Sequence, residues 1–270
     1  MPAIDPLAEP SALCPILIDA VREAGALALD MFGRELKTWT KHGTSPVCEA
    51  DIAVDRVLRE RLAAAAPEYG WRSEESGDDP ARLAARRVWI VDPIDGTRAY
   101  VRGIPDWSIA VALVEEGRPV LGAIFAPAEA ALFVAIAGAG ASLNGTVIQA
   151  SEGSKLEGAR VAGPRHRLEQ LAAVIPGIVT VPKIHSLALR LARVAQGALD
   201  IAFAARSSND WDLAAADLLV HEAGGALTDI EGRVLTYNRA DPGHEALVAA
   251  GRSRHRALLD LVQARKREFA

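Results

Sequence analysis

The spacing of apolar residues changes along this chain, and the changes restrict it to a fold that combines helices with sheets. From Ser11 to Met31 apolar residues recur at every third or fourth position, and Gly33 follows where a helix would end. A second helical pattern covers Val54–Ala65, and Pro67 ends it. From Val88 onward the apolar residues occur in short runs typical of strands. The chain therefore opens with two helices, which a sheet follows.

The apolar runs after Val88 are separated by signals for tight turns, which predicts an antiparallel meander. Glu115-Glu116-Gly117 and Asn144-Gly145 are two such turns, because glycine tolerates the positive φ that short hairpins need. With two helices beside its sheet, this part belongs to the α+β class. The expected strands are Val88–Val91, Trp107–Val114, Val120–Phe125 and Ala131–Ile136.

Beyond residue 150 the pattern changes again, to strands that alternate with helices. The Gly/Ser/Glu-rich passage Ser151–Gly158 separates the two parts, so we expect an N-terminal half of residues 1–150 and a C-terminal half of residues 151–270. This second half is predicted to be an α/β layer with a mixed sheet. Its expected strands are at Val161, Leu199–Ala204 and Ala226–Asp229, and its helices are Leu168–Val174, Ser186–Val194, Asp212–Ala223 and Arg254–Arg265.

Hydropathy and charge exclude several classes of protein. The longest apolar runs, such as Ile109–Val114, are far shorter than the ~20 residues of a membrane-spanning helix, and no basic segment precedes an apolar one near the N-terminus. We therefore expect a cytoplasmic protein with no membrane partner. The net charge is −5, with 30 basic and 35 acidic residues interspersed, so no general field attracts a nucleic-acid polymer. An anionic substrate would need a local cation, such as a bound metal.

The residues that favour zinc are too few to form a zinc site. Cys14 and Cys48 cannot supply four thiolates, and we interpret them as reduced packing residues. The histidines show no two-His metal spacing, and His221, on a predicted helix, is expected to be structural or exposed. A metal site in this chain would therefore use oxygen ligands.

The segment Trp89–Thr97 places two carboxylates just past a buried strand. Asp92 and Asp95 are three residues apart, and Pro93 disfavours the helical conformation at Asp92, so a sharp turn would bring both carboxylates to one point. A hard divalent cation, by default magnesium, would relieve their repulsion. Gly96 allows close approach of the backbone, and a helical turn beginning at Thr97 would direct free N–H groups toward a phosphate.

A plainer interpretation makes Asp92 and Asp95 turn-forming and helix-capping residues, which aspartates often are. Two further acidic features favour the metal site. Glu74-Glu75 lies in a loop before the strand, and Asp212 follows Trp211 at the start of a predicted helix.

Taken together, the motifs resemble those of the inositol monophosphatase superfamily, and they follow in order over roughly residues 15–250. The resemblance implies a five-layer α-β-α-β-α fold, a metal cluster between its halves, and lithium-sensitive hydrolysis of small phosphate monoesters. The matching segments are Ser73-Glu-Glu-Ser76, Asp92–Thr97, Gly122–Pro127 with Gly138-Ala-Gly140, and Trp211-Asp-Leu-Ala-Ala215 with Glu222-Ala-Gly-Gly225.

The resemblance also implies roles for individual residues. Glu74, Asp92 and the carbonyl of Ile94 would hold a first Mg²⁺, and Asp92, Asp95 and Asp212 a second. Asp51 matches an acid that assists a weaker third ion, and Mn²⁺ would substitute for Mg²⁺. Thr97 and Glu74 would orient and deprotonate the attacking water, while Asp95, Gly96 and Thr97 contact the phosphate. A homodimer is suggested by the resemblance alone.

The substrate is less closely indicated. Inositol-specific enzymes carry a Glu seven residues before the Trp-Asp aspartate, and this chain has Ala205 there. Ser186 and Arg190 are similar to a Ser-x-x-Leu-Lys pattern of bacterial 3′(2′),5′-bisphosphate nucleotidases, in which Arg190 would contact a second phosphate; a solvated helix position is the alternative. His185 stands where glycine is usual. We favour the nucleotidase over inositol-1-monophosphatase.

Further alternatives share the same metal motifs. Histidinol phosphatases and sugar bisphosphatases would leave the metal site unchanged. A non-catalytic metal-binding regulator is disfavoured because no expected ligand is missing from the sequence.

Overall fold

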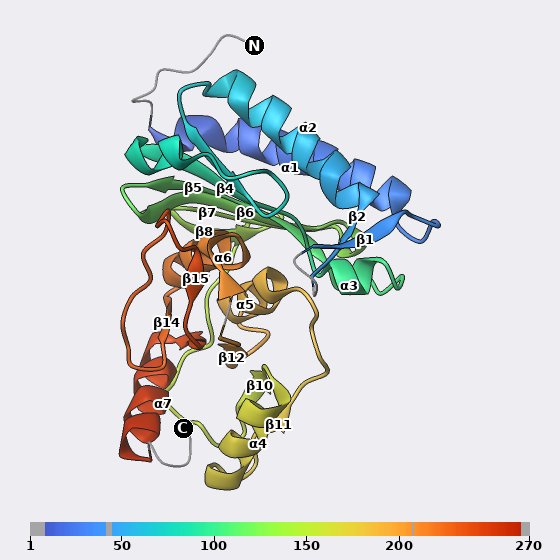
Figure 1. Cartoon of the computed structure of the whole chain (residues 1–270). Helices are drawn as coiled ribbons and strands as arrows, with labels where there is room; N and C mark the ends of the chain where they lie inside the picture. Colours follow the sequence, from blue (N-terminus) through green and yellow to red (C-terminus); the bar gives the residue numbers. More distant parts are fainter. Residues whose placement is uncertain (1–8, 42–44, 207, 266–270) are drawn as a thin grey trace.

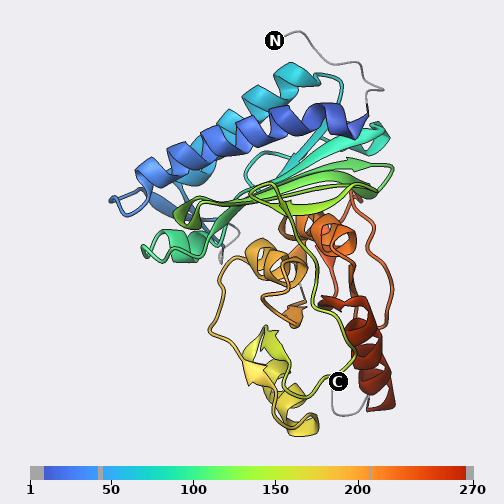
Figure 2. The ribbon, with the colours of Figure 1, turned by 180° about the vertical axis from the view of Figure 1, so that it is seen from behind.

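The computed structural model describes residues 9–41, 45–206 and 208–265, and over these residues the helices and sheets stack in five layers (Figure 1). Helices α1 and α2 cover the outer face of a large sheet, and α5 and α6 lie between that sheet and a smaller one. Helices α4 and α7 lie at the end farthest from α1 and α2, as the reverse view also shows (Figure 2). The predicted α-β-α-β-α order is confirmed. The bounds are α1 Pro10–Met31, α2 Glu49–Ala65, α4 Arg165–Val174, α5 Leu187–Ala195, α6 Asp210–Glu222 and α7 Arg252–Ala264.

The large sheet contains the predicted meander. From β4 to β9 every neighbouring pair is antiparallel, and the turns predicted at Glu116-Gly117 and Asn144-Gly145 connect β5 to β6 and β8 to β9. The strands, in their order across the sheet, are β3 Gly70–Ser73, β4 Arg87–Asp95, β5 Ser108–Glu115, β6 Arg118–Ala126, β7 Ala131–Ile136, β8 Gly140–Leu143 and β9 Thr146–Val147.

The edge strand β3 differs from the antiparallel sheet that we predicted, because it pairs with β4 in parallel. Residues 74–86 connect the two strands and include the 3₁₀ helix η1 (Pro80–Ala84). This connection is long enough for the crossover that a parallel pair requires. It also places the loop that carries Glu74 beside the end of β4.

Helices α1 and α2 pack on the large sheet through small residues. A Cβ on Gly25 would lie 2.4 Å from the ring of Phe125 on β6, so glycine lets α1 approach the sheet. At the start of α2, Cys48 and Asp51 form a capping box. The hairpin of β1 (Thr38–Lys41) and β2 (Ser45–Cys48) leads into this helix, and Cys14 lies half-buried on α1.

Helix α6 is buried on almost every side because it contacts both sheets. Its alanines keep it thin: a Cβ on Gly122 of β6 would lie 3.2 Å from the Cα atom of Ala215. A helix that is apolar all round is typical of such a central layer. The Asp212 at its beginning is thereby fixed between the two halves.

The smaller sheet is mixed, as predicted, with the order β11-β10-β12-β16-β14. Strand β16 was not predicted from the sequence, although it pairs with both β12 and β14. The bounds are β10 Arg160–Ala162, β11 Val179–Thr180, β12 Ile201–Ala204, β14 Gly225–Asp229 and β16 Leu247–Gly251; β13 Ser208–Asn209 and β15 Gly243–His244 form a separate pair.

The described chain contains no helix that is both long and apolar enough to span a bilayer. A large core cluster around α6 takes residues from both sheets, including Ile124, Phe133 and Leu227. The boundary near residue 150 between an N-terminal and a C-terminal half stays a prediction, and the two halves are closely packed.

Candidate active site

Three carboxylates converge where β4 ends and α6 begins. Side-chain oxygens of Asp92, Asp95 and Asp212 all lie within 4.8 Å of one another. The pairing of β4 with β5 shifts register between Asp92 and Asp95, so the sharp turn predicted around Pro93 is a bulge in the sheet. Asp212 is held by its helix, because its Oδ2 accepts a hydrogen bond from the backbone nitrogen of Asn209 over 2.6 Å.

This acid cluster fits a hard divalent cation. Asp92 is 1 % exposed, and its Oδ1 has no hydrogen-bond partner among the described residues. Burial, and the charges of neighbouring carboxylates, raise the pKa of Asp92 well above its usual value and that of Asp212 to about 7. A set of oxygen ligands from closely spaced acids that repel one another is the chemistry that Mg²⁺, Mn²⁺ or Ca²⁺ stabilises.

Glu74 reaches the cluster from the loop after β3. Its backbone nitrogen donates to the carbonyl of Val91 over 3.2 Å. Burial, followed by the charges of Asp212 and Glu75, raises the pKa of Glu74 to about 8. Lys41, at the end of β1, donates to the carbonyl of Glu74 and forms an ion pair with Glu75.

The carboxylate of Asp55 shapes the same loop, and no sequence motif had indicated it. Its Oδ1 accepts a hydrogen bond from Ser73 over 2.5 Å, and its Oδ2 accepts one from Ser76 over 2.6 Å. The two serines flank the Glu74-Glu75 pair. Asp55 therefore sets the direction in which the loop presents Glu74.

Asp51 and Thr97 lie side by side at the edge of the cluster. The hydroxyl of Thr97 is 3.1 Å from Oδ1 of Asp51 and 2.9 Å from the carbonyl oxygen of Ile94. The second oxygen of Asp51 accepts from the backbone nitrogen and the thiol of Cys48, over 2.8 and 2.9 Å. Gly96, with φ +97°, is the N-cap of the short helix α3 (Thr97–Tyr100). The helical turn predicted at Thr97 is therefore present.

The acid cluster opens into a pocket of about 430 Å³, and another pocket of the described chain is larger, with a volume of about 660 Å³. Both acidic and basic side chains line the acid cluster's pocket. The acids are Glu74, Asp92, Asp95 and Asp212, the positively charged residues are Arg98, Lys183 and Arg190, and His185 also lines the pocket. Arg98 and Lys183 had no signal in the sequence.

Two residues predicted to contact substrate have other partners. Ser186 is fully buried, and its hydroxyl donates to Asp95 over 2.6 Å. It therefore helps to orient the carboxylate of Asp95. Arg190 lines the pocket, but its guanidinium donates to the carbonyl of Phe203 over 3.0 Å and to that of Ile184 over 2.8 Å. Arg190 is thus a half-buried residue braced by the backbone, not a solvated one.

Comparison with known proteins agrees with this geometry. The model of the inositol monophosphatase family matches residues 9–267 of the chain. The chain belongs to the inositol monophosphatase family. It is 36% identical to an inositol-1-monophosphatase of Rhizobium meliloti, over 82% of this chain and 87% of that protein. It is 29% identical to a 3′(2′),5′-bisphosphate nucleotidase of Aggregatibacter actinomycetemcomitans, over 83% and 87%.

Solved structures in the inositol monophosphatase family share the fold. The inositol monophosphatase of Thermotoga maritima superposes with a TM-score of 0.81 at 29% identity, covering 94% of this chain and 97% of that one. The family predicted from the motifs is therefore confirmed, and its relatives differ in the substrates for which they are named.

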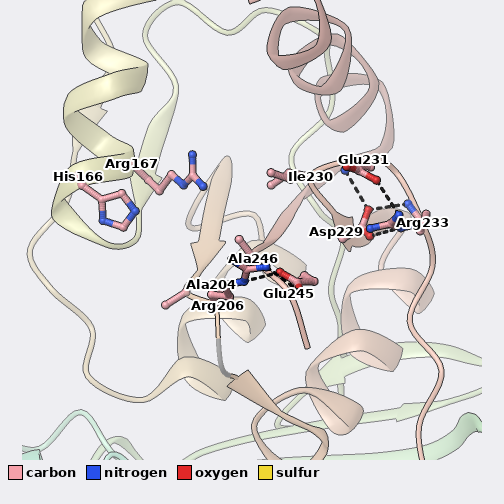
Figure 3. A pocket seen from close by; sticks show the side chains of 11 residues that line it. His166, Arg167, Ala204, Arg206, Asp229, Ile230, Glu231, Arg233, Glu245 and Ala246 are labelled. Carbon is pink, nitrogen blue, oxygen red and sulfur yellow. Dashed lines mark hydrogen bonds and ion pairs between the residues drawn. The ribbon is translucent and has the colours of Figure 1, made fainter. Parts of the chain in front are cut away.

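Ala205 stands where the resemblance predicted a glutamate in inositol-specific enzymes, and it lies in a different cavity from the acid cluster. Ala205 lines the larger pocket, to which α4, β12 and β14 also contribute residues. In this pocket Arg206 pairs with Glu245, and Arg233 pairs with Asp229 (Figure 3). Ala205 is absent from the residues that line the acid cluster's pocket, and its methyl side chain offers no acceptor for a substrate hydroxyl.

Proposed function

We propose that this protein is a magnesium-dependent phosphatase that hydrolyses a small phosphate monoester by direct attack of water. The observation that carries the proposal is the convergence of three carboxylates, of which those of Asp92 and Asp95 are buried, with Oδ1 of Asp92 unpartnered among the described residues. Family membership supports a phosphoric monoester hydrolase. All the acids expected to hold the metals are present in the chain, which disfavours a non-catalytic metal-binding regulator.

Two ions would be held by this chain's oxygens, with a third, weaker ion near Asp51. The first set is Glu74, Asp92 and the carbonyl of Ile94, and the second is Asp92, Asp95 and Asp212. Bound Mg²⁺ would supply charge neutralisation for the phosphoryl oxygens and lower the pKa of a coordinated water. Mn²⁺ is expected to substitute and Li⁺ to inhibit.

The side chains would then orient and deprotonate the water. The single hydroxyl hydrogen of Thr97 points to Asp51 or to the carbonyl of Ile94, so its oxygen is left to accept a hydrogen bond from water. Glu74, whose loop faces the cluster, would take the proton. Asp95, Gly96 and Thr97 would contact the phosphate.

For the substrate we favour a 3′(2′),5′-bisphosphate nucleotide, converted to the monophosphate. Arg98, Lys183 and Arg190 line the same pocket as the acids, and their charges suit a second phosphate. Inositol 1-phosphate is the alternative, supported by the 36% identity to the Rhizobium enzyme. Histidinol phosphatases are also among the relatives, at up to 37% identity. A cytoplasmic homodimer completes the proposal.

The test is phosphate release with Mg²⁺, with and without Li⁺, from adenosine 3′,5′-bisphosphate and from inositol 1-phosphate in parallel. A strong preference for the nucleotide supports the bisphosphate nucleotidase. A preference for inositol 1-phosphate rejects that substrate and keeps the phosphatase. If no phosphate is released from either compound or from p-nitrophenyl phosphate, the proposed phosphatase activity itself is rejected.

A further inference from the structure

His185 and Asp106 form a hydrogen-bonded pair in the wall of the acid cluster's pocket. Oδ2 of Asp106 lies 2.6 Å from the backbone nitrogen of His185 and 2.8 Å from its ring nitrogen Nδ1. The His185 side chain is 24 % exposed and lines the pocket beside Gly96 and Thr97. Neither member of the pair is among the metal ligands proposed above.

The carboxylate of Asp106 decides which ring nitrogen of His185 carries hydrogen. A carboxylate oxygen only accepts hydrogen bonds, so Nδ1 is the donor in this pair. In the neutral ring, Nε2 then carries a lone pair and no hydrogen. Nε2 has no hydrogen-bond partner within the described chain, and it lies on the ring edge opposite Asp106. The pair thus presents an unused acceptor to the pocket.

The backbone around the pair is rigidly packed against the turn that follows the acid cluster. The nitrogen of Ser186 donates to the carbonyl of Asp106 over 3.2 Å. A Cβ on Gly96 would lie 3.3 Å from both of these atoms. The segment that carries His185 therefore rests directly on the Gly96–Thr97 turn, and His185 lines the same pocket as the residues proposed to contact the phosphate.

We propose that His185, oriented by Asp106, accepts a hydrogen bond from a hydroxyl on the alcohol part of the substrate. The inference rests on the proposed phosphatase function and names the residue that selects among its substrates. His185 would select esters that carry a hydroxyl near the phosphate over otherwise identical esters without one. It would supply the acceptor that Ala205 does not provide.

A neutral acceptor suits a hydroxyl better than a second phosphate. A hydroxyl donates a hydrogen to the Nε2 lone pair, whereas a phosphate oxygen offers only lone pairs of its own. The positive charge for an anionic group comes instead from Lys183 and Arg98, which line the same pocket and are exposed. The two parts of the wall would thus recognise different parts of one substrate.

The experiment compares kcat/KM for matched esters that differ by hydroxyls. One pair is adenosine 3′,5′-bisphosphate and its 2′-deoxy analogue, and the other is inositol 1-phosphate and cyclohexyl phosphate. Wild type should favour the hydroxyl-bearing member of the pair it hydrolyses by about fivefold, as expected for one neutral hydrogen bond of about 1 kcal/mol. His185→Phe and His185→Gly should bring that ratio close to one, and His185→Gln, which keeps an acceptor, should retain part of it.

A second histidine provides the control. His166 is exposed on α4 and lines the other cavity, so His166→Phe should leave the ratio at the wild-type value. Should His185→Phe fail to fold, His185→Gly decides, because it removes the ring without adding bulk.

The possible failures are separable. Wild type that hydrolyses both members of a pair equally, or a ratio that survives in His185→Gly, overturns the inference while the phosphatase stands. The inference is also wrong if His185→Gly lowers kcat/KM equally for both members of a pair, since the ring would then not distinguish the hydroxyl. Absence of phosphate release from every ester, including p-nitrophenyl phosphate, overturns the proposed function and this inference together.

Discussion

The hydroxyl of Ser186 donates to Oδ2 of Asp95 over 2.6 Å, across a separation of 91 residues in the sequence. The same oxygen accepts from the backbone nitrogen of Ala188 over 2.6 Å, so the first turn of α5 fixes the orientation of this carboxylate. Ser186 also accepts from Leu189 and caps the helix. A ligand from the first half of the chain is therefore oriented by a helix from the second half.

Replacing Ser186 by alanine should weaken metal binding without removing a ligand. Asp95 would lose one of its two supports, and removal of such an outer partner typically costs 10- to 100-fold in metal affinity or activity. We expect the Mg²⁺ concentration for half-maximal phosphate release to rise by about tenfold. Ser142→Ala is the control, since Ser142 lies on β8 and contacts the carbonyl of Val134. An unchanged Mg²⁺ requirement would contradict the supporting role.

The substitution Asp95→Asn should abolish most activity and leave the fold intact. The amide keeps an oxygen that can accept from Ser186 and Ala188, but it loses the charge that ligates a metal. Turnover should fall by several orders of magnitude, while the unfolding temperature stays near that of wild type. Asp79→Asn, at the exposed cap of η1, should change neither quantity. Near wild-type turnover in Asp95→Asn would remove Asp95 from the site.

The fold is predicted best where periodicity is long. Helix α1 and the hairpin strands β5 to β7 appear within one or two residues of their expected ends, because each repeats its pattern over several turns or pairs. Strand β16 was missed because Leu247–Gly251 is a short apolar run that only its pairing with β12 and β14 makes a strand. The parallel pairing of β3 depends likewise on a crossover that no local signal reveals.

The acid cluster could be expected from sequence because its ligands lie in recognisable motifs. The residues that hold these ligands in place could not be predicted in the same way. Asp55 contacts a residue 18 positions away in the sequence, and Asp106 contacts one 79 positions away. Lys183 is recognised only because it lines the pocket. The roles expected for Ser186 and Arg190 depended on where a helix places each side chain, and both side chains are held by other parts of the chain.

Asp55 should govern the position of Glu74 although it lies outside the cluster. Asp55→Ala removes the acceptor for Ser73 and Ser76, which frees the loop that carries Glu74. Because the loop would have to be ordered again when metal binds, we expect the Mg²⁺ requirement to rise by roughly tenfold, as for other outer partners of a metal site. Isothermal titration with Mg²⁺ measures this directly. Asp19→Ala, on the exposed face of α1, provides the comparison, and equal affinities in the two variants would refute the role of Asp55.

A second acid, Asp200, should make stability depend on pH far from the active site. Its carboxylate accepts from Ser151 over 2.6 Å and from the backbone and Nε of Arg160 over 2.8 and 2.9 Å. Burial alone would raise the pKa of Asp200, but the hydrogen bonds from Arg160 and Ser151 lower it below its usual 3.8. Asp200 therefore joins the start of the second half to β10 through its charged form.

The sign of the pH dependence follows from that lowered pKa. Above pH 3.8 the carboxylate of Asp200 is charged in both the folded and the unfolded chain, and its stabilisation of the fold is complete. Below pH 3.8 Asp200 is protonated first in the unfolded chain. Stability is therefore lost as the pH falls toward the lower pKa of Asp200 in the folded chain. Urea unfolding should show Asp200→Asn about 2 kcal/mol less stable than wild type at pH 7, the range of a hydrogen bond to a charged group. The difference should shrink by up to about 1.4 kcal/mol per unit below pH 4. In Asp30→Asn, which breaks an exposed pair with Arg34, it should stay small at every pH. A deficit in Asp200→Asn that is constant from pH 7 to pH 3 would mean that Asp200 stabilises the fold by its shape and not by its charge.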